Sequence, residues 1–248
     1  MHPEITRLPS AVLFDLDDTL FDHRYSARCA LEDLQARHPV LEKHSLELLV
    51  REDLRLLGEK HPLVLAGTLS IADSRIQRMQ GLFAACGTAV DADEAQYFAD
   101  LRQRTYREMR RAVPGAIPLL QQLKSQVKIG IVTNNFREEQ RDKLDACGLS
   151  DFVDVLVTSE EVRHAKPDRR IFESALRQLS CDASRAVMVG DSWEFDVLGA
   201  WNASLRSIWF NRDGAEQPSH PHAHEITSLE PADIIAEQIL HVRVGHEI

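Results

Sequence analysis

The sequence predicts an α/β protein in which a parallel sheet is interrupted by an inserted helical domain. Across most of the 248 residues, short apolar segments of strand length alternate with segments of helical length. This alternation is typical of a parallel sheet covered by helices. Between residues 22 and 113 the alternation stops and only helical periodicity is found. We therefore expect a core domain formed by residues 1–21 and 114–248, and a helical domain formed by residues 22–113.

The strand predictions rest on segments that are short, mostly apolar and bounded by polar or turn-forming residues, a pattern typical of strands buried on both faces. Four segments have this character: Ala11–Phe14, Val127–Val132, Val153–Val157 and Ala186–Val189. A fifth, Leu205–Phe210, is less regular, and we expect it nearer to an edge of the sheet. The helical segments between the strands are Arg137–Cys147, Arg169–Leu179 and Trp193–Asn202.

Residues 22–113 contain four apolar stripes with the spacing of amphipathic helices. The stripes are Ala27, Ala30, Leu31 and Leu34; Leu46, Leu49, Val50, Leu54 and Leu57; Ala72, Ile76, Met79 and Phe83; and Phe98, Leu101, Thr105 and Met109. Asp91 and Glu94 form a capping-box-like pattern, which predicts the start of the fourth helix. Arg75 and Arg78 flank the third stripe. We interpret them as part of a solvated helix face, with contact to an anionic group of a substrate as the alternative.

Composition excludes several classes of function. Acidic residues outnumber basic ones by 39 to 29, so broad contact with the phosphates of a nucleic acid is not expected. The four cysteines lie far apart without a C-x-x-C pair, as expected for reduced thiols. The N-terminal residues do not resemble a signal peptide, and no apolar run of about 20 residues is present. We expect a cytoplasmic protein that binds no membrane; the sequence does not indicate its oligomeric state.

Two aspartates, Asp15 and Asp17, directly follow the first predicted strand. Because successive residues of an extended segment point to opposite sides, both carboxylates can face one cavity while Leu16 points away. Paired acids at this spacing suit one nucleophile and one proton donor, or two metal ligands. In parallel sheets, ligands bind beyond the carboxyl ends of the strands, where these residues lie.

Polar residues also follow the other three central strands. They are Thr133 and Asn134 after the second strand, Lys166 after the third, and Asp191, Ser192 and Asp196 after the fourth. A phosphate dianion is repelled by carboxylates, by about 4 kcal/mol for unit charges 4 Å apart at an effective dielectric near 20. A lysine and a hard divalent cation remove this obstacle, and carboxylates with room for waters suit Mg²⁺.

The segments FDLDDTLF, IVTNN, KPDRRIF and VGDSWEFD resemble the four ordered motifs of the haloacid dehalogenase (HAD) superfamily. The helical insert between the first two motifs is similar to the cap of the subfamily that carries its cap at that place. The resemblance implies a Rossmann-like core with an inserted all-helical cap domain. It also implies a hydrolase.

The resemblance implies a role for each motif residue. Asp15 would attack phosphorus to form an aspartyl phosphate, while Asp17 would protonate the leaving oxygen and later activate water. Thr133 and Lys166 would hold the transferring oxygens. The remaining implied roles are Mg²⁺ ligation by Asp15, Asp191 and the backbone carbonyl of Asp17, phosphate contacts from Leu16 and Asn134, and support from Asp196 and Ser192.

Membership of this superfamily does not fix the reaction. Dehalogenases of the family lack the aspartate that follows the nucleophile by two residues, so Asp17 and Asp191 together favour Mg²⁺-dependent hydrolysis of a small phosphorylated metabolite. A nucleotide or a sugar phosphate fits this description. The alternatives are a 2-haloacid dehalogenase, a phosphomutase, or a receiver-like phosphoaspartate signalling module. The role of the histidine-rich loop at residues 220–224 stays open.

Overall fold

The computed structural model describes residues 8–216 and 224–242, and the chain divides into two compact units. One unit contains the residues up to Asp22 and those from Ala112 onward, and the other is His23–Arg111. The expected domain boundaries, after residues 21 and 113, lie one residue and two residues from these limits. None of the helices in the described ranges is both long and apolar enough to cross a membrane.

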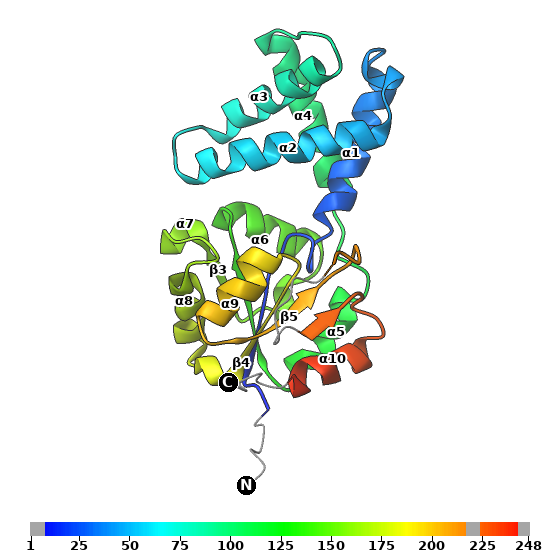
Figure 1. Ribbon diagram of the computed structural model, residues 1–248. Coiled ribbons are helices and arrows are strands. Elements are labelled where there is room, and N and C mark those ends of the chain that lie inside the picture. Colours follow the sequence, from blue (N-terminus) through cyan, green and yellow to red (C-terminus); the bar gives the residue numbers. More distant parts are fainter. Residues whose placement is uncertain (1–7, 217–223, 243–248) are drawn as a thin grey trace. The chain divides into compact units, whose positions relative to one another are not determined.

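The first unit is built on a sheet of six parallel strands in the order β3-β2-β1-β4-β5-β6 (Figure 1). The strands are β1 Ala11–Phe14, β2 Lys128–Thr133, β3 Val155–Thr158, β4 Ala186–Gly190, β5 Arg206–Phe210 and β6 His224–Ile226. Every residue of β1, β4 and β5 is buried, as expected for strands covered on both faces.

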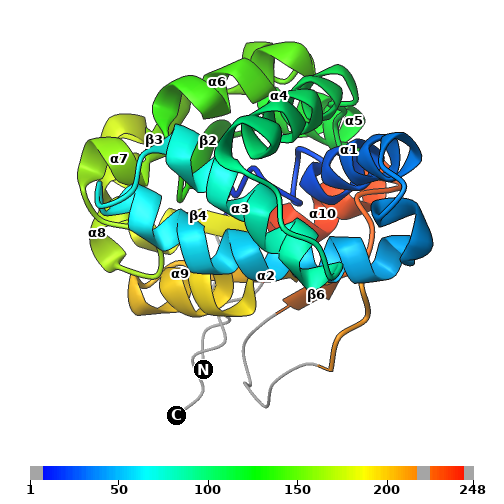
Figure 2. The same ribbon diagram turned by 90° about the horizontal axis from the view of Figure 1, so that it is seen from above.

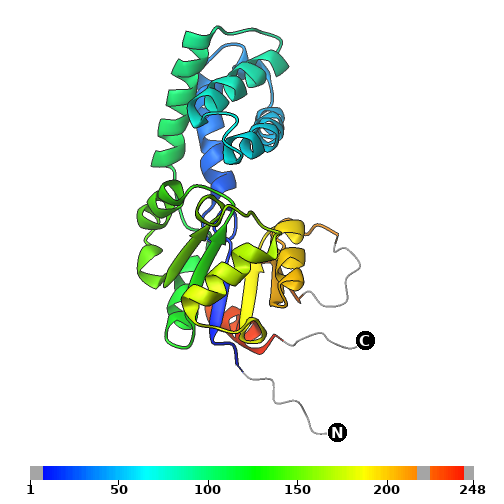
Figure 3. The ribbon, with the colours of Figure 1, turned by 90° about the vertical axis from the view of Figure 1, so that its left-hand side faces the viewer.

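Helices cover both faces of this sheet (Figure 3). Three lie on one face: α5 Ala116–Lys124, α6 Arg137–Ala146 and α10 Ala232–His241. On the other face lie α8 Arg169–Leu179, the π-helical segment η4 Trp193–Leu198 and α9 Gly199–Asn202. The connections contain the short helix α7 Ser159–Val162 and the 3₁₀ turns η2 Ser150–Phe152 and η3 Ala183–Arg185.

The predicted fold class, a parallel α/β core with a helical insertion after the first strand, is confirmed. The register explains why the motif residues meet at one edge. Phe14, the last residue of β1, is level with Ile131 of β2 and Val189 of β4, so the polar residues that follow these strands begin at similar heights. The short strand β6 was not predicted, because three residues that begin with a histidine carry no strand pattern. It pairs with β5, which is therefore second from the edge.

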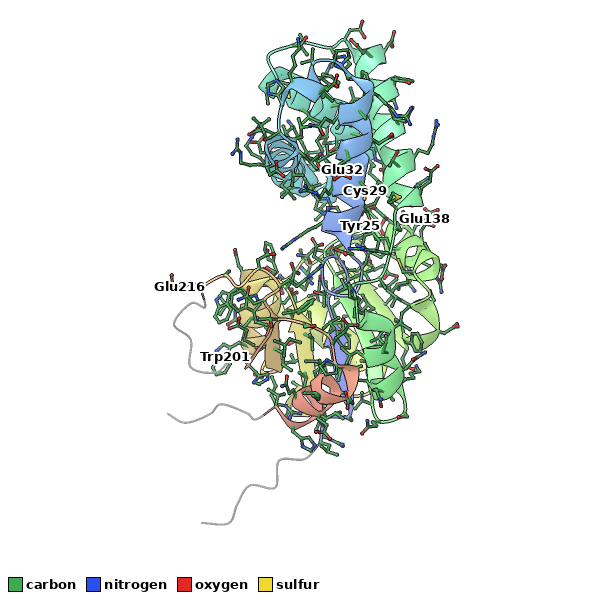
Figure 4. All side chains as sticks on the ribbon, turned by 90° about the vertical axis from the view of Figure 1, so that its right-hand side faces the viewer. Tyr25, Cys29, Glu32, Glu138, Trp201 and Glu216 are labelled. Carbon is green, nitrogen blue, oxygen red and sulfur yellow. The ribbon has the colours of Figure 1, made fainter. Side chains whose placement is uncertain are left out.

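The second unit consists of four helices and one 3₁₀ turn, and its helices carry the labels α1 to α4 in Figure 2. They are α1 His23–Arg37, η1 Leu41–Lys43, α2 Leu46–Leu65, α3 Ile71–Ala85 and α4 Ala92–Glu108. Three of these helices begin at a capping side chain: Ser45, Ser70 and Asp91 each accept a hydrogen bond from the backbone amide three residues on. Along α1, Tyr25, Cys29 and Glu32 follow one another at intervals of four and three residues, the spacing of a single helix face (Figure 4).

The predicted apolar stripe of α2 is wrong in part. Leu54 is 46% exposed, whereas Asp53 and Leu56 are buried. An acid therefore occupies the inward position that the apolar pattern would give to a hydrophobic residue, and the true inward face is shifted by one residue.

Two buried arginines explain the burial of Asp53. Arg78 donates to one carboxylate oxygen of Asp53 at 2.8 Å, and Arg102 donates to the other at 2.6 Å. Burial alone would raise the pKa of Asp53, but attraction to Arg102 and Arg78 outweighs it and holds the pKa below its ordinary value. The interpretation of Arg78 as part of a solvated helix face is therefore wrong, because its charge is paired inside the helical unit.

Candidate active site

A tight turn after β1 places the two motif aspartates. The carbonyl of Leu16 accepts hydrogen bonds from the amides of Thr19, Leu20 and Phe21, so the chain reverses immediately after Asp15. Asp18 takes up a left-handed backbone conformation with φ of 64°, which aspartate adopts more readily than most residues. Leu16 is fully buried.

Asp15 forms a buried ion pair with Lys166. The Nζ atom of Lys166 lies 2.5 Å from Asp15 Oδ1 and 2.7 Å from Asp196 Oδ1. All three side chains are at most 10% exposed, so this ammonium group is shared between two carboxylates away from bulk water. The other oxygen of Asp196 accepts a hydrogen bond from the amide of Ser192 at 3.0 Å.

Burial shapes the ionisation of this group. It raises the pKa of Asp15 to about 7, with Lys166 acting in the opposite direction and Asp196 in the same one. Burial alone would lower the pKa of Lys166, but the two carboxylates outweigh it and hold that pKa above its ordinary value. A cation placed beside Asp15 would favour its ionised form, because opposite charges lower the pKa of a carboxyl group.

Asp17 is held by two residues of α6. Lys143 Nζ lies 2.7 Å from Asp17 Oδ1, and Gln140 Nε2 donates to Asp17 Oδ2 at 2.9 Å. The same amide nitrogen donates to Thr133 Oγ1 at 3.2 Å. Because Thr133 accepts this hydrogen bond, its hydroxyl proton is available to another acceptor.

The loops after β2 and β3 are joined through Asn134. Its Nδ2 atom donates to the carbonyl of Lys166 at 2.9 Å, and its Oδ1 atom accepts from the amide of Lys166 at 2.7 Å. Both polar ends of the Asn134 side chain are thus directed at the backbone of Lys166, which fixes the point from which the lysine side chain extends. The Asn134 side chain thus positions Lys166, and its predicted contact with phosphate stays a prediction.

The loop after β4 meets the turn after β1 through Thr19. Thr19 Oγ1 accepts from the amide of Asp191 at 3.1 Å and lies 3.5 Å from Asp15 Oδ2. Trp209 Nε1 donates to the carbonyl of Asp191 at 2.9 Å. The backbone of Asp191 is therefore held on both sides, which orients its side chain relative to Asp15.

Three carboxylates form a possible cation site. One oxygen from each of Asp15, Asp191 and Asp196 lies within 4.8 Å of the other two. Hard oxygen ligands of this kind suit Mg²⁺ or Ca²⁺ rather than a softer metal. The set fits a divalent cation, although both oxygens of Asp196 already accept hydrogen bonds. The same holds for Asp15, whose oxygens accept from Lys166 and Thr19.

The structure brings together Asp15, Asp17, Thr133, Lys166, Asp191 and Asp196, the side chains predicted for the site. It also adds Thr19, which belongs to the first motif but was given no role at the site, and two residues outside the motifs, Gln140 and Lys143. The segment Arg137–Ala146 held a signal for the last two, because its only large apolar residue is Leu144. A helix packed on a sheet needs more than one inward position, so polar residues on the same side had to be buried.

Comparison with known proteins decides the family. The family model described as haloacid dehalogenase-like hydrolase matches residues 9–203. The chain belongs to this family. The prediction from the four motifs is thus confirmed, and so is the prediction that this HAD chain is a hydrolase.

Curated HAD relatives carry phosphatase names. Pyrimidine 5'-nucleotidase YjjG of Escherichia coli is 46% identical over 112 residues, which are 45% of this chain and half of that relative. A glyceraldehyde 3-phosphate phosphatase of Methanothermobacter thermautotrophicus is 33% identical over 211 residues, covering 83% of this chain and 87% of the relative.

Solved HAD structures show the same fold. YfnB of Bacillus subtilis, crystallised with bound magnesium, has a TM-score of 0.74 at 23% identity and covers 93% of this chain and all of that chain. A 2-haloacid dehalogenase of Pseudomonas syringae has a TM-score of 0.60 at 30% identity and covers 93% of this chain and 99% of that one. Similar HAD proteins thus include both phosphatases and dehalogenases, so the reaction has to be argued from the site.

Proposed function

We propose that this protein is a Mg²⁺-dependent phosphatase that hydrolyses a small phosphorylated metabolite through an aspartyl phosphate on Asp15. The observation that carries the proposal is the position of Asp17. Its carboxylate is held by Lys143 and Gln140 next to Thr133, beside the ion pair of Asp15. The site thus contains an acid separate from the nucleophile, which an ester of phosphoric acid requires.

Asp15 supplies the nucleophile in this proposal. A carboxylate oxygen of Asp15 attacks phosphorus, a new oxygen–phosphorus bond forms, and the bond to the leaving oxygen breaks. Lys166 and Thr133 donate to the phosphoryl oxygens as charge shifts onto them. Because Asn134 fixes the backbone of Lys166, its part is to position the lysine, and the backbone amide after Asp15, that of Leu16, is a further donor to phosphate.

Asp17 transfers the protons. In the first step it gives a proton to the leaving alkoxide, and in the second it takes one from the water that attacks phosphorus. The second step releases inorganic phosphate and restores the carboxylate of Asp15. Asp17 therefore regains from water the proton that it gave to the leaving group, and each turnover starts from the same state.

Asp15, Asp191 and the backbone carbonyl of Asp17 would hold Mg²⁺, with Asp196 and Ser192 in support. The cation would neutralise charge on the phosphoryl oxygens and keep Asp15 ionised against the effect of burial. The cluster of three carboxylates favours this assignment, since Lys166 brings one positive charge to the three acids and a divalent cation would further reduce the repulsion between them.

Dehalogenation is the second candidate, favoured by the similarity to the 2-haloacid dehalogenase of Pseudomonas syringae. A halide leaves without a proton, so that reaction gives no task to the carboxylate of Asp17 or to a cation at Asp191. A phosphomutase needs a second phosphate-binding arm, and no residue of the site is assigned to one. A receiver module would accept one phosphoryl group rather than turn over.

The substrate class is supported by the names of two relatives, a pyrimidine 5'-nucleotidase and a glyceraldehyde 3-phosphate phosphatase. We propose a small phosphate monoester as the substrate. The test is a screen of nucleoside monophosphates, sugar phosphates and 2-haloacids with the purified protein, with and without Mg²⁺. Multiple turnovers on a phosphate ester that vanish in Asp15→Asn support the proposal. Release of halide without phosphatase activity would contradict it.

A further inference from the structure

We propose that Lys143 and Gln140 are positioning residues, which hold the carboxylate of Asp17 where it exchanges protons with the leaving group and with water. This inference rests on the proposed function, because it assigns a partner to the acid of that reaction. Neither residue belongs to the four motifs, and both lie on α6, three residues apart, so they share one face of the helix.

Lys143 is buried in an unusual way for a lysine on a helix that covers a sheet. Such lysines ordinarily extend the ammonium group into water, but this side chain is 2% exposed. Its ammonium lies 2.7 Å from Asp17, 3.6 Å from Glu139 and 5.2 Å from the centre of the Phe21 ring. The ring face covers the charge and directs it at the carboxylate. The partner Asp17 is 28% exposed, so the pair has one buried and one accessible end.

The orientation of the Gln140 side-chain amide supports the same role, that of holding the carboxylate of Asp17. Its nitrogen donates to both Asp17 and Thr133, while its Oε1 atom, although buried, has no hydrogen-bond partner among the described residues. Turning the amide over would set an oxygen against the carboxylate of Asp17. The oxygens of Asp17 therefore decide the orientation, and Gln140 serves as a donor while its own carbonyl oxygen has no partner among the described residues.

Together these contacts hold both oxygens of Asp17 from one rigid helix. An aspartate that is 28% exposed would otherwise occupy several rotamers, and only some of them place its oxygens near the site. Lys143 holds Oδ1 and Gln140 holds Oδ2, so the plane of the carboxylate is set as well as its position. Gln140 also couples that position to Thr133, the proposed phosphate donor.

A purely structural role, in which the pair only fastens α6 to the turn after β1, makes a different kinetic prediction. Loss of a structural contact lowers activity on every substrate alike. Loss of a positioned acid matters most where the leaving group needs a proton. An alkyl phosphate has a poor leaving group, whereas p-nitrophenol leaves without much assistance.

The test compares kcat and KM for glycerol phosphate and p-nitrophenyl phosphate in the wild type and Lys143→Met. We expect kcat for the alkyl ester to fall about 10- to 100-fold, a part of the contribution of a general acid. For the p-nitrophenyl ester we expect less than about a five-fold fall, with KM nearly unchanged. Lys143→Arg should recover part of the loss. The control is Arg141→Met, an exposed residue on the same helix, which should behave as wild type.

Two further measurements guard the conclusion. Gln140→Met is an independent variant with the same expected selectivity, should Lys143→Met fail to fold. Crystal structures of the wild type and of a folded variant should show that the carboxylate of Asp17 is displaced in the variant relative to the wild type. Equal losses on both esters, or an unmoved Asp17, would overturn the proposal. If the wild type hydrolyses neither these two esters nor any phosphate ester of the screen, the proposed function fails, while the two crystal structures still decide whether the helix holds Asp17.

Discussion

Gly190, the last residue of β4, leaves no room for a side chain beside Asp196. A Cβ atom at position 190 would overlap the carboxyl group of Asp196, the same group that accepts from Lys166. The close approach explains why a glycine ends this central strand. It also ties the backbone of β4 to the buried ion pair.

Gly190→Ala should therefore damage the site through Asp196. The added methyl group forces the carboxylate away from Lys166, so we expect at least a ten-fold loss of kcat and a loss of about 1–3 kcal/mol in unfolding free energy. The control is Gly58→Ala on α2, where a Cβ would meet no atom within 4 Å. That variant should be neutral or slightly stabilising. Wild-type activity in Gly190→Ala would show that Asp196 does not matter to Lys166.

Lys166→Met should remove the ammonium shared by two buried acids. Asp15 and Asp196 then face each other without the ammonium group that pairs with both. Breaking a buried ion pair in this way costs about 3–5 kcal/mol. We expect a lower unfolding midpoint in denaturant, and a smaller difference from wild type when Mg²⁺ is present. Equal destabilisation with and without Mg²⁺ would count against a cation site at Asp15.

Asp191→Ala should weaken the binding of Mg²⁺. A ligand at 100 times its Kd stabilises the folded state by about 2.7 kcal/mol, so Mg²⁺ should raise the unfolding temperature of the wild type. We expect Asp191→Ala to need a higher Mg²⁺ concentration for the same rise and for activity. Asp182→Ala, at an exposed acid elsewhere, is the control. An unchanged Mg²⁺ response in Asp191→Ala would remove that residue from the metal site.

Asp53→Asn should destabilise the helical unit in a pH-dependent manner. The pKa of Asp53 is lowered in the folded state, so its ionised form contributes stability above the ordinary pKa near 3.9. That contribution is lost as the pH falls through the lowered value. The unfolding free energies of wild type and variant should differ by about 3–5 kcal/mol at pH 7, since two buried arginines lose their partner. The difference should shrink below pH 4; a constant difference would contradict the ionic role of Asp53.

The parts of the fold that the sequence predicts well are those where one physical pattern acts alone. The central strand β1 has the predicted bounds, Ala11–Phe14, because a fully buried strand of a parallel sheet has to be apolar throughout. The motif residues were found for a related reason, since each follows such a strand. Polar groups at strand ends cannot be explained by packing.

The parts that could not be predicted are buried polar groups whose partners lie far away in the chain. Asp53 takes an inward position on α2 only because Arg78 and Arg102 reach it from other helices. Lys143 is buried because its ammonium group forms an ion pair with Asp17, which lies 126 residues away in the chain. Apolar periodicity assigns such residues to the surface, and nothing local in the sequence overrides that assignment.

The most direct test of the central claim is to identify the residue that carries the phosphoryl group during turnover. The protein is mixed with a phosphate ester and Mg²⁺, quenched in acid, reduced with borohydride and digested, and the modified peptide is located by mass spectrometry. We predict that reduction of an acyl phosphate converts Asp15 to homoserine, only when ester and Mg²⁺ are both present. Steady release of phosphate with no modification at Asp15, or modification of a different carboxylate, would contradict the account.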